Sequence, residues 1–148
     1  MPIPPLNEIG VLPPGTHACT IGEVQERFGV FKGSDRRIVL TARLFEYFVA
    51  ASAANVGSCL YVDGSYVTAK PEPDDIDLLL ILREDVELDA TVPPFEYNAR
   101  SRGYVKKKFG FDFYFGFEND ASSERMLATF RRVKGVPGAE KGLLRLDL

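Results

Sequence analysis

Three aspartates in this chain have the residue type and the spacing of a metal-binding cluster. Asp75 and Asp77 open an almost unbroken apolar run that ends at Leu82, and Asp112 lies within the aromatic run 111–115. Alternate side chains of an extended strand share one face, so Asp75 and Asp77 point the same way with Cα atoms about 6 to 7 Å apart. A neighbouring strand that carries Asp112, about 4.8 Å away, would complete a cluster of three carboxylates.

Like charges in such a cluster repel one another, and burial raises the pKa of each carboxyl group unless a cation compensates. A hard divalent ion is the simplest remedy, because Mg²⁺ prefers carboxylate oxygens, keeps several waters and completes its octahedron with substrate phosphates. We therefore predict that Asp75, Asp77 and Asp112 are metal ligands and catalytic residues. Mg²⁺ is the expected cofactor, with Mn²⁺ as an alternative ion.

The Asp-x-Asp pair is a weak signal when taken alone. Short motifs recur by chance, and the end of a strand is often capped by solvated acids. Aspartate is nevertheless depleted in strands, and a pair that opens a Leu/Ile run sits where an ordinary core excludes charge. The context therefore favours the metal site over the solvated strand end.

A Gly-Ser turn precedes the acid pair. Gly64-Ser65 follows the strand-like segment 59–62. Glycine at such a turn lets the backbone approach a phosphate, while the Ser65 hydroxyl and the N–H groups of a helix start bind its charge. The same dipeptide also makes an ordinary tight turn with a positive φ angle. We predict Gly64 and Ser65 as nucleotide-binding residues, together with Lys70, which lies between the turn and the acid pair.

Other charged residues carry weaker signals. The lysine run 106–108 could bind phosphate or RNA, but such a run is also typical of solvated charge that protects an edge strand from aggregation. His17 is the only histidine and has no Ser or Cys partner in a triad-like pattern, so we expect a structural role for it.

The composition is that of a globular protein. Of the 148 residues 45% are hydrophobic and 26% are charged, and the net charge of -3 argues against wholesale attraction to nucleic acid. Cys19 and Cys59 show no ligand-type repeat, so we expect reduced thiols in a cytoplasmic protein. No segment approaches the apolar run of about 18 residues that a membrane span needs, so no membrane association is expected.

Turn signals and hydrophobic periodicity predict one domain over residues 1–148, with an irregular, proline-rich N-terminal arm at about 1–19. A capping box at Thr20 and Glu23 starts the first helix, and the second helix carries a single apolar stripe. The expected helices cover about 21–28 and 36–54, with Gly57 ending the second, and a third helix starts at Ser122 or Ser123. The expected strands cover about 59–62, 76–82, 111–117 and 142–148. This order indicates an α+β fold with a small mixed or antiparallel β-sheet.

Two of these strands have patterns that place the acids. The run 76–82 is apolar throughout, which suits a central strand covered on both faces. In the strand 111–117, aromatic residues alternate with Asp112. We therefore expect four rings in one layer of the core, with Asp112 on the opposite face; these are Phe111, Phe113, Phe115 and Phe117.

Together, Gly64-Ser65, Asp75-Ile76-Asp77 and Phe111-Asp112-Phe113 resemble the signature of the DNA polymerase β-like nucleotidyltransferase superfamily. In that signature, Gly-Ser is followed by an acid-x-acid pair and then by a third acid on a neighbouring strand. The flanking segments 12–17 and 141–144 are similar to a small bacterial family within the superfamily. Members place helices on one face of a small mixed sheet and the metal site on the other.

The resemblance implies a metal-dependent transfer of a nucleoside monophosphate from an NTP to a hydroxyl of RNA, protein or a small molecule, with release of pyrophosphate. It implies that Asp75 and Asp77 hold two Mg²⁺ ions when the NTP is bound. Asp112 would ligate the ion that activates the acceptor hydroxyl, and Gly64 and Ser65 would seat the β and γ phosphates. A second copy or a partner protein is expected to grip the base or the acceptor, as in the minimal nucleotidyltransferases of bacterial toxin–antitoxin pairs.

Two other classes of function stay open. A catalytically silent nucleotidyltransferase-like binding or regulatory partner would keep the scaffold, although it would have no reason to retain three repelling carboxylates. A nucleic-acid-binding protein that acts through the lysine run 106–108 would bind RNA with a strong dependence on salt.

Overall fold

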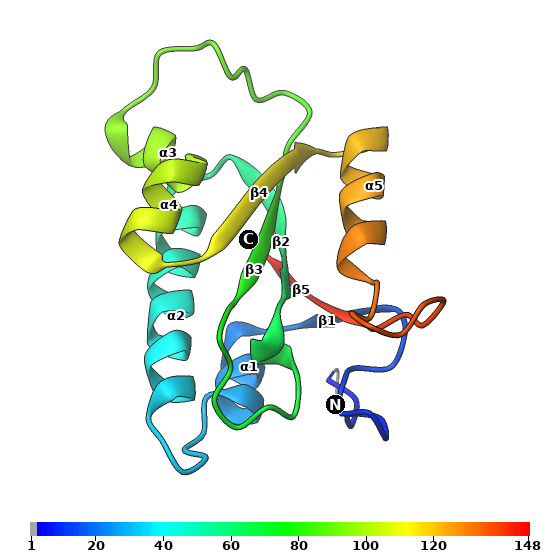
Figure 1. Ribbon diagram of the computed structural model, residues 1–148. Helices are drawn as coiled ribbons and strands as arrows, with labels where there is room; N and C mark the ends of the chain where they lie inside the picture. Colours follow the sequence, from blue (N-terminus) through cyan, green and yellow to red (C-terminus); the bar gives the residue numbers. More distant parts are fainter. Residues whose placement is uncertain (1–2) are drawn as a thin grey trace.

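The computed structural model describes residues 3–148; Met1 and Pro2, which belong to the expected N-terminal arm, lie outside the described residues. Its centre is an open five-stranded sheet with helices on both faces (Figure 1). In chain order the elements are β1 (Thr16–Cys19), α1 (Ile21–Phe28), α2 (Arg36–Ala54), β2 (Gly57–Asp63), the short 3₁₀ helix η1 (Ser65–Val67), β3 (Asp77–Leu82), α3 (Pro94–Ala99), α4 (Arg102–Phe109), β4 (Asp112–Phe117), α5 (Ala121–Phe130) and β5 (Leu143–Asp147). These elements confirm the predicted α+β fold.

The strands lie in the order β1-β5-β2-β3-β4, so the last strand along the chain is inside the sheet. β5 pairs parallel with β1 and antiparallel with β2. β3 pairs antiparallel with β2 and parallel with β4. The sheet is therefore mixed, with β1 and β4 at its two edges.

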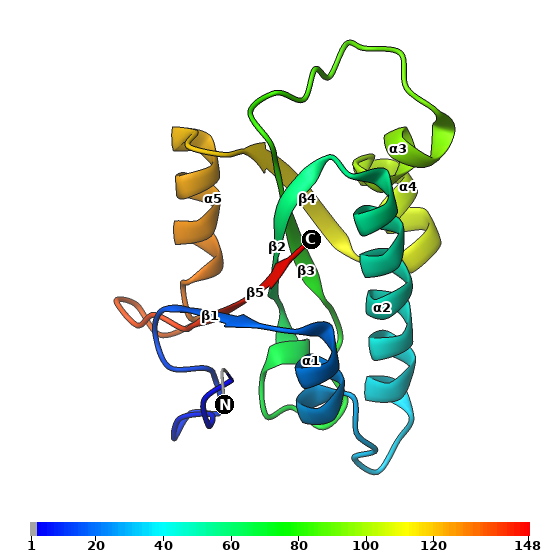
Figure 2. The ribbon, with the colours of Figure 1, turned by 180° about the vertical axis from the view of Figure 1, so that it is seen from behind.

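Successive side chains of the strands alternate between two apolar layers. The larger layer packs the sheet against α1, α2 and α4, and its strand residues include Leu60, Val62, Leu78, Leu80, Phe113 and Leu144. The smaller layer joins Cys59, Leu79, Ile81 and Leu143 to Leu127 and Phe130 of α5. Figures 1 and 2 accordingly show α2, α3 and α4 on one side of the sheet and α5 on the other. Four helices thus share one face, whereas α5 covers the other, so the expectation that the helices pack on one face is wrong for α5.

The first two helices form as their sequences predict. The Thr20 hydroxyl accepts a hydrogen bond from the Glu23 N–H, and the Glu23 carboxylate accepts one from the Thr20 N–H, so the capping box is confirmed. α2 covers 36–54 as expected, but its C-cap is Asn55, with a φ angle of 54°. Asparagine tolerates this left-handed conformation, so the helix ends before Gly57, which instead begins β2. Within residues 3–148, no helix has both the length and the apolar character needed to cross a bilayer.

The start of α5 differs from the expectation. The N-cap is Asp120, whose carboxylate accepts a hydrogen bond from the Ser122 N–H. A carboxylate at this place also interacts favourably with the helix dipole, which explains why it outcompetes the serines. Ser123 is buried and donates to the Phe117 carbonyl, so it packs α5 against β4 instead of capping the helix.

The expected four-ring layer of β4 is wrong at one position. Phe111 and Phe113 are fully buried and Phe117 is partly buried, but Phe115 is exposed. The reason is that β4 is an edge strand with a neighbour on one side only, so the helical layer does not cover its whole length. Asp112 points to the opposite face from these rings, as the alternation predicts.

The N-terminal arm is shorter than expected. Residues 16–19 form β1, which pairs in register with residues 143–146 of β5. The prediction of irregular backbone as far as residue 19 is therefore wrong for this strand, because its pairing partner lies at the other end of the chain. His17 Nε2 lies 2.7 Å from the Pro13 carbonyl oxygen, a contact that agrees with a structural role.

Arg37 of α2 fixes the loop that follows the Gly-Ser turn. Its buried guanidinium donates hydrogen bonds to the backbone carbonyls of Phe28, Tyr66, Thr68 and Lys70. Its Cζ atom also lies 5.9 Å from the ring centroid of Phe28 and 5.6 Å from that of Tyr66. Carbonyl dipoles and ring faces therefore stabilise this charge, although burial still lowers the pKa of Arg37.

We expect Arg37→Leu to lower the free energy of unfolding by about 3 kcal/mol, because each buried carbonyl left without a donor costs about 1 to 3 kcal/mol before water relaxes it. Urea denaturation followed by circular dichroism measures the change. Arg43→Leu, on the exposed face of the same helix, is the control and should change stability by less than about 0.5 kcal/mol. Equal losses in the two variants would contradict the anchoring role of Arg37.

Candidate metal centre

The three predicted acids meet on the α5 face of the sheet. Asp77 of β3 pairs in register with Asp112 of β4, so the two side chains point to the same face. Asp75 lies two residues before Asp77, just outside β3. One carboxylate oxygen from each residue lies within 4.8 Å of the other two. The structure thus brings together Asp75, Asp77 and Asp112, all three partly buried.

The Gly-Ser turn orients Asp75. Ser65 donates from its backbone N–H and from its hydroxyl to Asp75 Oδ1, each over 2.8 Å, and the hydroxyl accepts the Asp74 N–H. Gly64 has a φ angle of 95°, and a Cβ there would lie 2.9 Å from the Asp75 carbonyl oxygen, so a side chain would be strained and crowded. The predicted turn is present, and its serine is committed to Asp75. Contacts of Gly64 and Ser65 with phosphate stay a prediction.

A fourth acid, Asp63, lies beside Asp77 at the end of β2. Its side chain is only 3% exposed, and Lys141 Nζ lies 3.0 Å from its Oδ1 atom. This oxygen nevertheless receives no well-aligned hydrogen bond within residues 3–148. Burial raises the pKa of Asp63, while the charge of Lys141 opposes the rise. The Asp63–Lys141 pair therefore lies buried beside the acid cluster, with one carboxylate oxygen of Asp63 incompletely hydrogen-bonded.

Asp77 lies at the centre of this crowding. Burial, followed by the charges of Asp75, Asp63 and Asp112, raises the pKa of Asp77 to about 7. Lys141 acts in the opposite sense but does not cancel the rise. A divalent cation bound beside Asp77 would stabilise its charged carboxylate and lower its pKa again.

Lys106 of α4 compensates part of the charge. Its Nζ atom lies 2.9 Å from Asp112 Oδ1, and both side chains are about half exposed, at 58% and 46%. The carboxylate of Asp112 raises the pKa of Lys106. Exposed ion pairs of this kind contribute little, so a divalent ion can displace the lysine. Among residues 3–148, four carboxylates still face two ammonium groups, those of Lys106 and Lys141.

The remaining predicted lysine lies apart from the acids. Lys70 forms an ion pair with the exposed Asp74 and is not one of the residues that line the adjacent cavity. Its contact with a nucleotide therefore stays a prediction. In the lysine run, Lys108 packs over the rings of Tyr104 and Phe109 on α4, as expected for solvated charge on a helix.

The donor set of the cluster suits Mg²⁺ or Mn²⁺. Three carboxylates supply hard oxygen ligands, and no His or Cys joins them among the described residues. The negative excess and the raised pKa of Asp77 both fall when a divalent cation binds. The residues present therefore fit the predicted metal.

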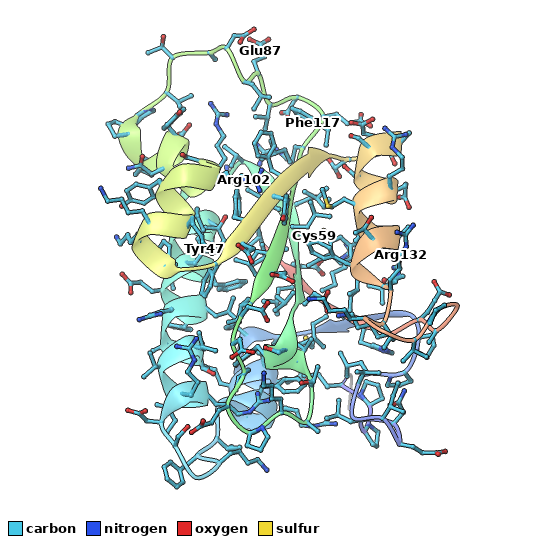
Figure 3. All side chains as sticks on the ribbon, in the orientation of Figure 1. Tyr47, Cys59, Glu87, Arg102, Phe117 and Arg132 are labelled. Atoms are coloured by element: carbon cyan, nitrogen blue, oxygen red, sulfur yellow. The ribbon has the colours of Figure 1, made fainter. Side chains whose placement is uncertain are left out.

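A cavity of about 880 Å³ adjoins the acids, a volume in the range of small-molecule sites. On one side it is lined by the turn and the acids, including Asp63, Gly64, Ser65, Asp75 and Asp77. Lys141 lies with these acids, and the rest of the lining comes from β4, α5 and the segment that follows, through Tyr114, Met126, Thr129, Phe130, Arg132, Val133 and Lys134. Figure 3 shows Arg132 at the carboxyl end of α5. Asp63, Asp75 and Asp77 thus lie in the wall of a cavity large enough to take a substrate, and Asp112 lies beside them outside its lining.

Sequence reasoning missed the residues that complete this site. Asp63 directly precedes Gly64, so an acid at the end of a strand beside a Gly-Ser turn was a signal that could have been used. Lys141 gave no local signal, because it reaches Asp63 only through the pairing of β5 with β2. The wall formed by α5 likewise depends on that helix crossing to the second face of the sheet.

Comparison with known proteins places the chain in a family. Residues 4–147 match the family described as a family of unknown function (DUF6932), and the chain belongs to that family. No curated protein and no solved structure matches the chain.

We expect the metal-free protein to lose stability, relative to Asp77→Asn, as the pH rises from about 4 to about 7. The pKa of Asp77 is raised from 3.8 in the unfolded chain to about 7 in the folded state, so folding favours the protonated carboxyl group. The stability that this group contributes is therefore full below pH 3.8 and is lost as the pH rises to about 7. Above pH 7 the variant should be more stable by roughly 2 to 4 kcal/mol. Urea denaturation in EDTA at pH 4, 6 and 8 measures the difference.

Adding Mg²⁺ or Mn²⁺ at pH 8 should raise the melting temperature of the wild-type protein and leave that of Asp77→Asn nearly unchanged, because bound metal stabilises only the folded state. Asp85→Asn, in an exposed loop, is the control. In the metal-free experiment, the two proteins should differ in free energy of unfolding by an amount that depends on pH. A difference between wild type and Asp77→Asn that stays constant with pH would contradict the crowding of charge around Asp77.

We also expect Lys106→Met to strengthen Mn²⁺ binding by about two- to fivefold, because the metal no longer has to displace an exposed ammonium group from Asp112. Titration calorimetry measures the affinity at low ionic strength. Lys107→Met removes the same charge one residue along α4 and should have a smaller effect. Weaker binding in Lys106→Met would show that the lysine does not compete with the metal.

Proposed function

We propose that this protein is a metal-dependent nucleotidyltransferase of the DNA polymerase β-like superfamily. It moves a nucleoside monophosphate from an NTP to a hydroxyl acceptor on RNA, protein or a small molecule and releases pyrophosphate. A cytoplasmic location belongs to the same proposal, since NTPs are supplied there and both cysteines are free thiols. The observation that carries the proposal is the meeting of three carboxylates beside a Gly-Ser turn, two of which, those of Asp75 and Asp77, line a cavity.

The roles of the acids follow from their positions. Asp75 and Asp77 would hold two divalent ions for the triphosphate, and Asp112 would add a ligand for the ion that activates the acceptor hydroxyl. Bound metal ions supply charge neutralisation and lower the pKa of an attacking hydroxyl. The contribution of the protein is to keep the ligands in place before substrate arrives, which the hydrogen bonds from Ser65 to Asp75 and the register of Asp77 with Asp112 support.

The proposed reaction is a single in-line displacement. The acceptor oxygen forms a bond to the α phosphorus, and the bond from that phosphorus to the oxygen of the β phosphate breaks. Pyrophosphate leaves, and the hydroxyl proton passes to solvent. Lys141, held beside Asp63 and lining the cavity, offers a cation for the charge that develops on the phosphates.

The acceptor determines the wider role that we propose. A hydroxyl of RNA or protein, presented by a partner or a second copy of the chain, would fit a small enzyme of a toxin–antitoxin or defence system. The cavity leaves space for one small substrate, so a macromolecular acceptor would approach from its open side.

One observation favours a second function, that of a catalytically silent binding or regulatory partner. Lys106 already pairs with Asp112, which lowers the demand for metal at the third acid. Titration calorimetry of Mg²⁺ with an NTP separates the two functions. A silent module would bind no better than its Asp77→Asn variant.

Incubation of the protein with Mg²⁺, each α-labelled NTP and a cell lysate tests the enzyme. We expect a labelled acceptor and release of pyrophosphate, with a loss of at least about a hundredfold in Asp77→Asn, since the proposed chemistry depends on this ligand. Asp85→Asn is the control with the same chemical change outside the site. Absence of label with every NTP, in a protein that binds Mg²⁺ and NTP, would favour the silent partner.

A further inference from the structure

The cavity extends well beyond the acids. Metal ions and phosphates would occupy the end lined by Asp75 and Asp77, whereas the opposite wall is largely apolar and comes from β4 and α5. An apolar wall does not favour binding of a triphosphate, because phosphate oxygens are strongly hydrated. This second wall therefore suits a less polar part of a substrate.

Aromatic contacts hold the second wall in place. Tyr114 lies two residues after Asp112 on β4, so its side chain leaves the same face of the sheet about 6 to 7 Å further along. Its ring meets that of Phe130 edge to face, with the centroids 6.0 Å apart, and Arg102 lies 4.8 Å above it. Met126 of α5 packs against the same layer. A rigid surface of Tyr114, Met126 and Phe130 is therefore fixed next to the metal ligands.

The polar groups around the cavity match a ligand with an anionic end. Lys141 lies near the acids, and Arg132 and Lys134 follow the end of α5. Asp63 is buried, lines the cavity and keeps one oxygen without a well-aligned hydrogen bond among the described residues, an acceptor for a bound cation or a hydroxyl of the ligand and not for its anionic end. A ligand that joins a metal-bound phosphate chain to a flat, weakly polar ring satisfies both ends of this cavity.

We infer that the wall formed by Tyr114, Met126 and Phe130 binds the base and ribose of the nucleotide, a statement that rests on the proposed function. The chain then holds the nucleoside itself, on its own α5, and needs no second copy for that purpose. The nucleoside lies across Thr129, whose exposed side chain lines the cavity between the apolar wall and the segment 132–134.

Calorimetric titrations with an NTP and with inorganic tripolyphosphate, each in the presence of Mn²⁺, test this inference. Both ligands carry the phosphate chain, and only the NTP carries a nucleoside. We expect the NTP to bind at least about tenfold more tightly than tripolyphosphate, in line with the value of stacking a base on an aromatic wall.

Thr129→Trp places a large ring where the nucleoside would lie. It should weaken NTP binding by about tenfold, and so remove the preference, while tripolyphosphate binding stays unchanged. Ala128→Trp is the matched control, because Ala128 is also exposed on α5 but does not line the cavity. Met126→Ala, which shortens the wall without filling the cavity, should also lower the preference for the NTP.

Equal affinity of the wild-type protein for the NTP and tripolyphosphate would overturn the nucleoside wall and leave the proposed function in place. A preference that survives in Thr129→Trp, or that falls equally in Ala128→Trp, would overturn it as well. Failure of both ligands to bind in the presence of Mn²⁺ would overturn the proposed function and this inference together.

Discussion

The candidate site depends on a strand register that sets like charges side by side. Asp63, Asp77 and Asp112 are direct neighbours across β2, β3 and β4, an arrangement that is unfavourable in an ordinary sheet. The register cannot slip to relieve it, because β3 is apolar on both faces from Leu78 onward and a shift of one residue would turn Asp77 into the larger apolar layer. The hydrophobic core thus imposes the crowding, and a bound cation offers the simplest relief.

Elements outside the sheet keep the crowded groups oriented. Ser65 holds Asp75 through two hydrogen bonds, and Arg37 anchors the loop that follows the Gly-Ser turn. Lys141 reaches Asp63 from the segment before β5. Each of these groups is already engaged within the protein, which is the condition for ligands to be in position before a substrate binds.

Much of this arrangement could be predicted from the sequence, because its signals are local. The alternation of strand residues placed Asp75, Asp77 and Asp112 on one face, and the capping box gave the start of α1. What could not be predicted depends on contacts between distant segments. β1 forms only because β5 is beside it, and the Asp63–Lys141 pair needs β5 beside β2.

The expectation for the aromatic strand failed for a related reason. Alternation gives the direction of a side chain but not whether anything covers it, and Phe115 lies on an edge strand where cover is incomplete. The turn at Gly64 shows the opposite case. Its positive φ angle was foreseeable from the residue type, whereas the commitment of the Ser65 hydroxyl to Asp75 was a property of the closed loop.

The position of β5 between β1 and β2 has a consequence for how the molecule assembles. Within residues 3–148, β1 has no other partner in the sheet, so it can pair only when residues 143–146 are in place. Contacts of such long sequence separation make folding slow. Lys141, the partner of Asp63, belongs to the same segment. Until this segment docks, Asp63 therefore has no ammonium partner, and the sheet exposes an acid that the folded protein buries.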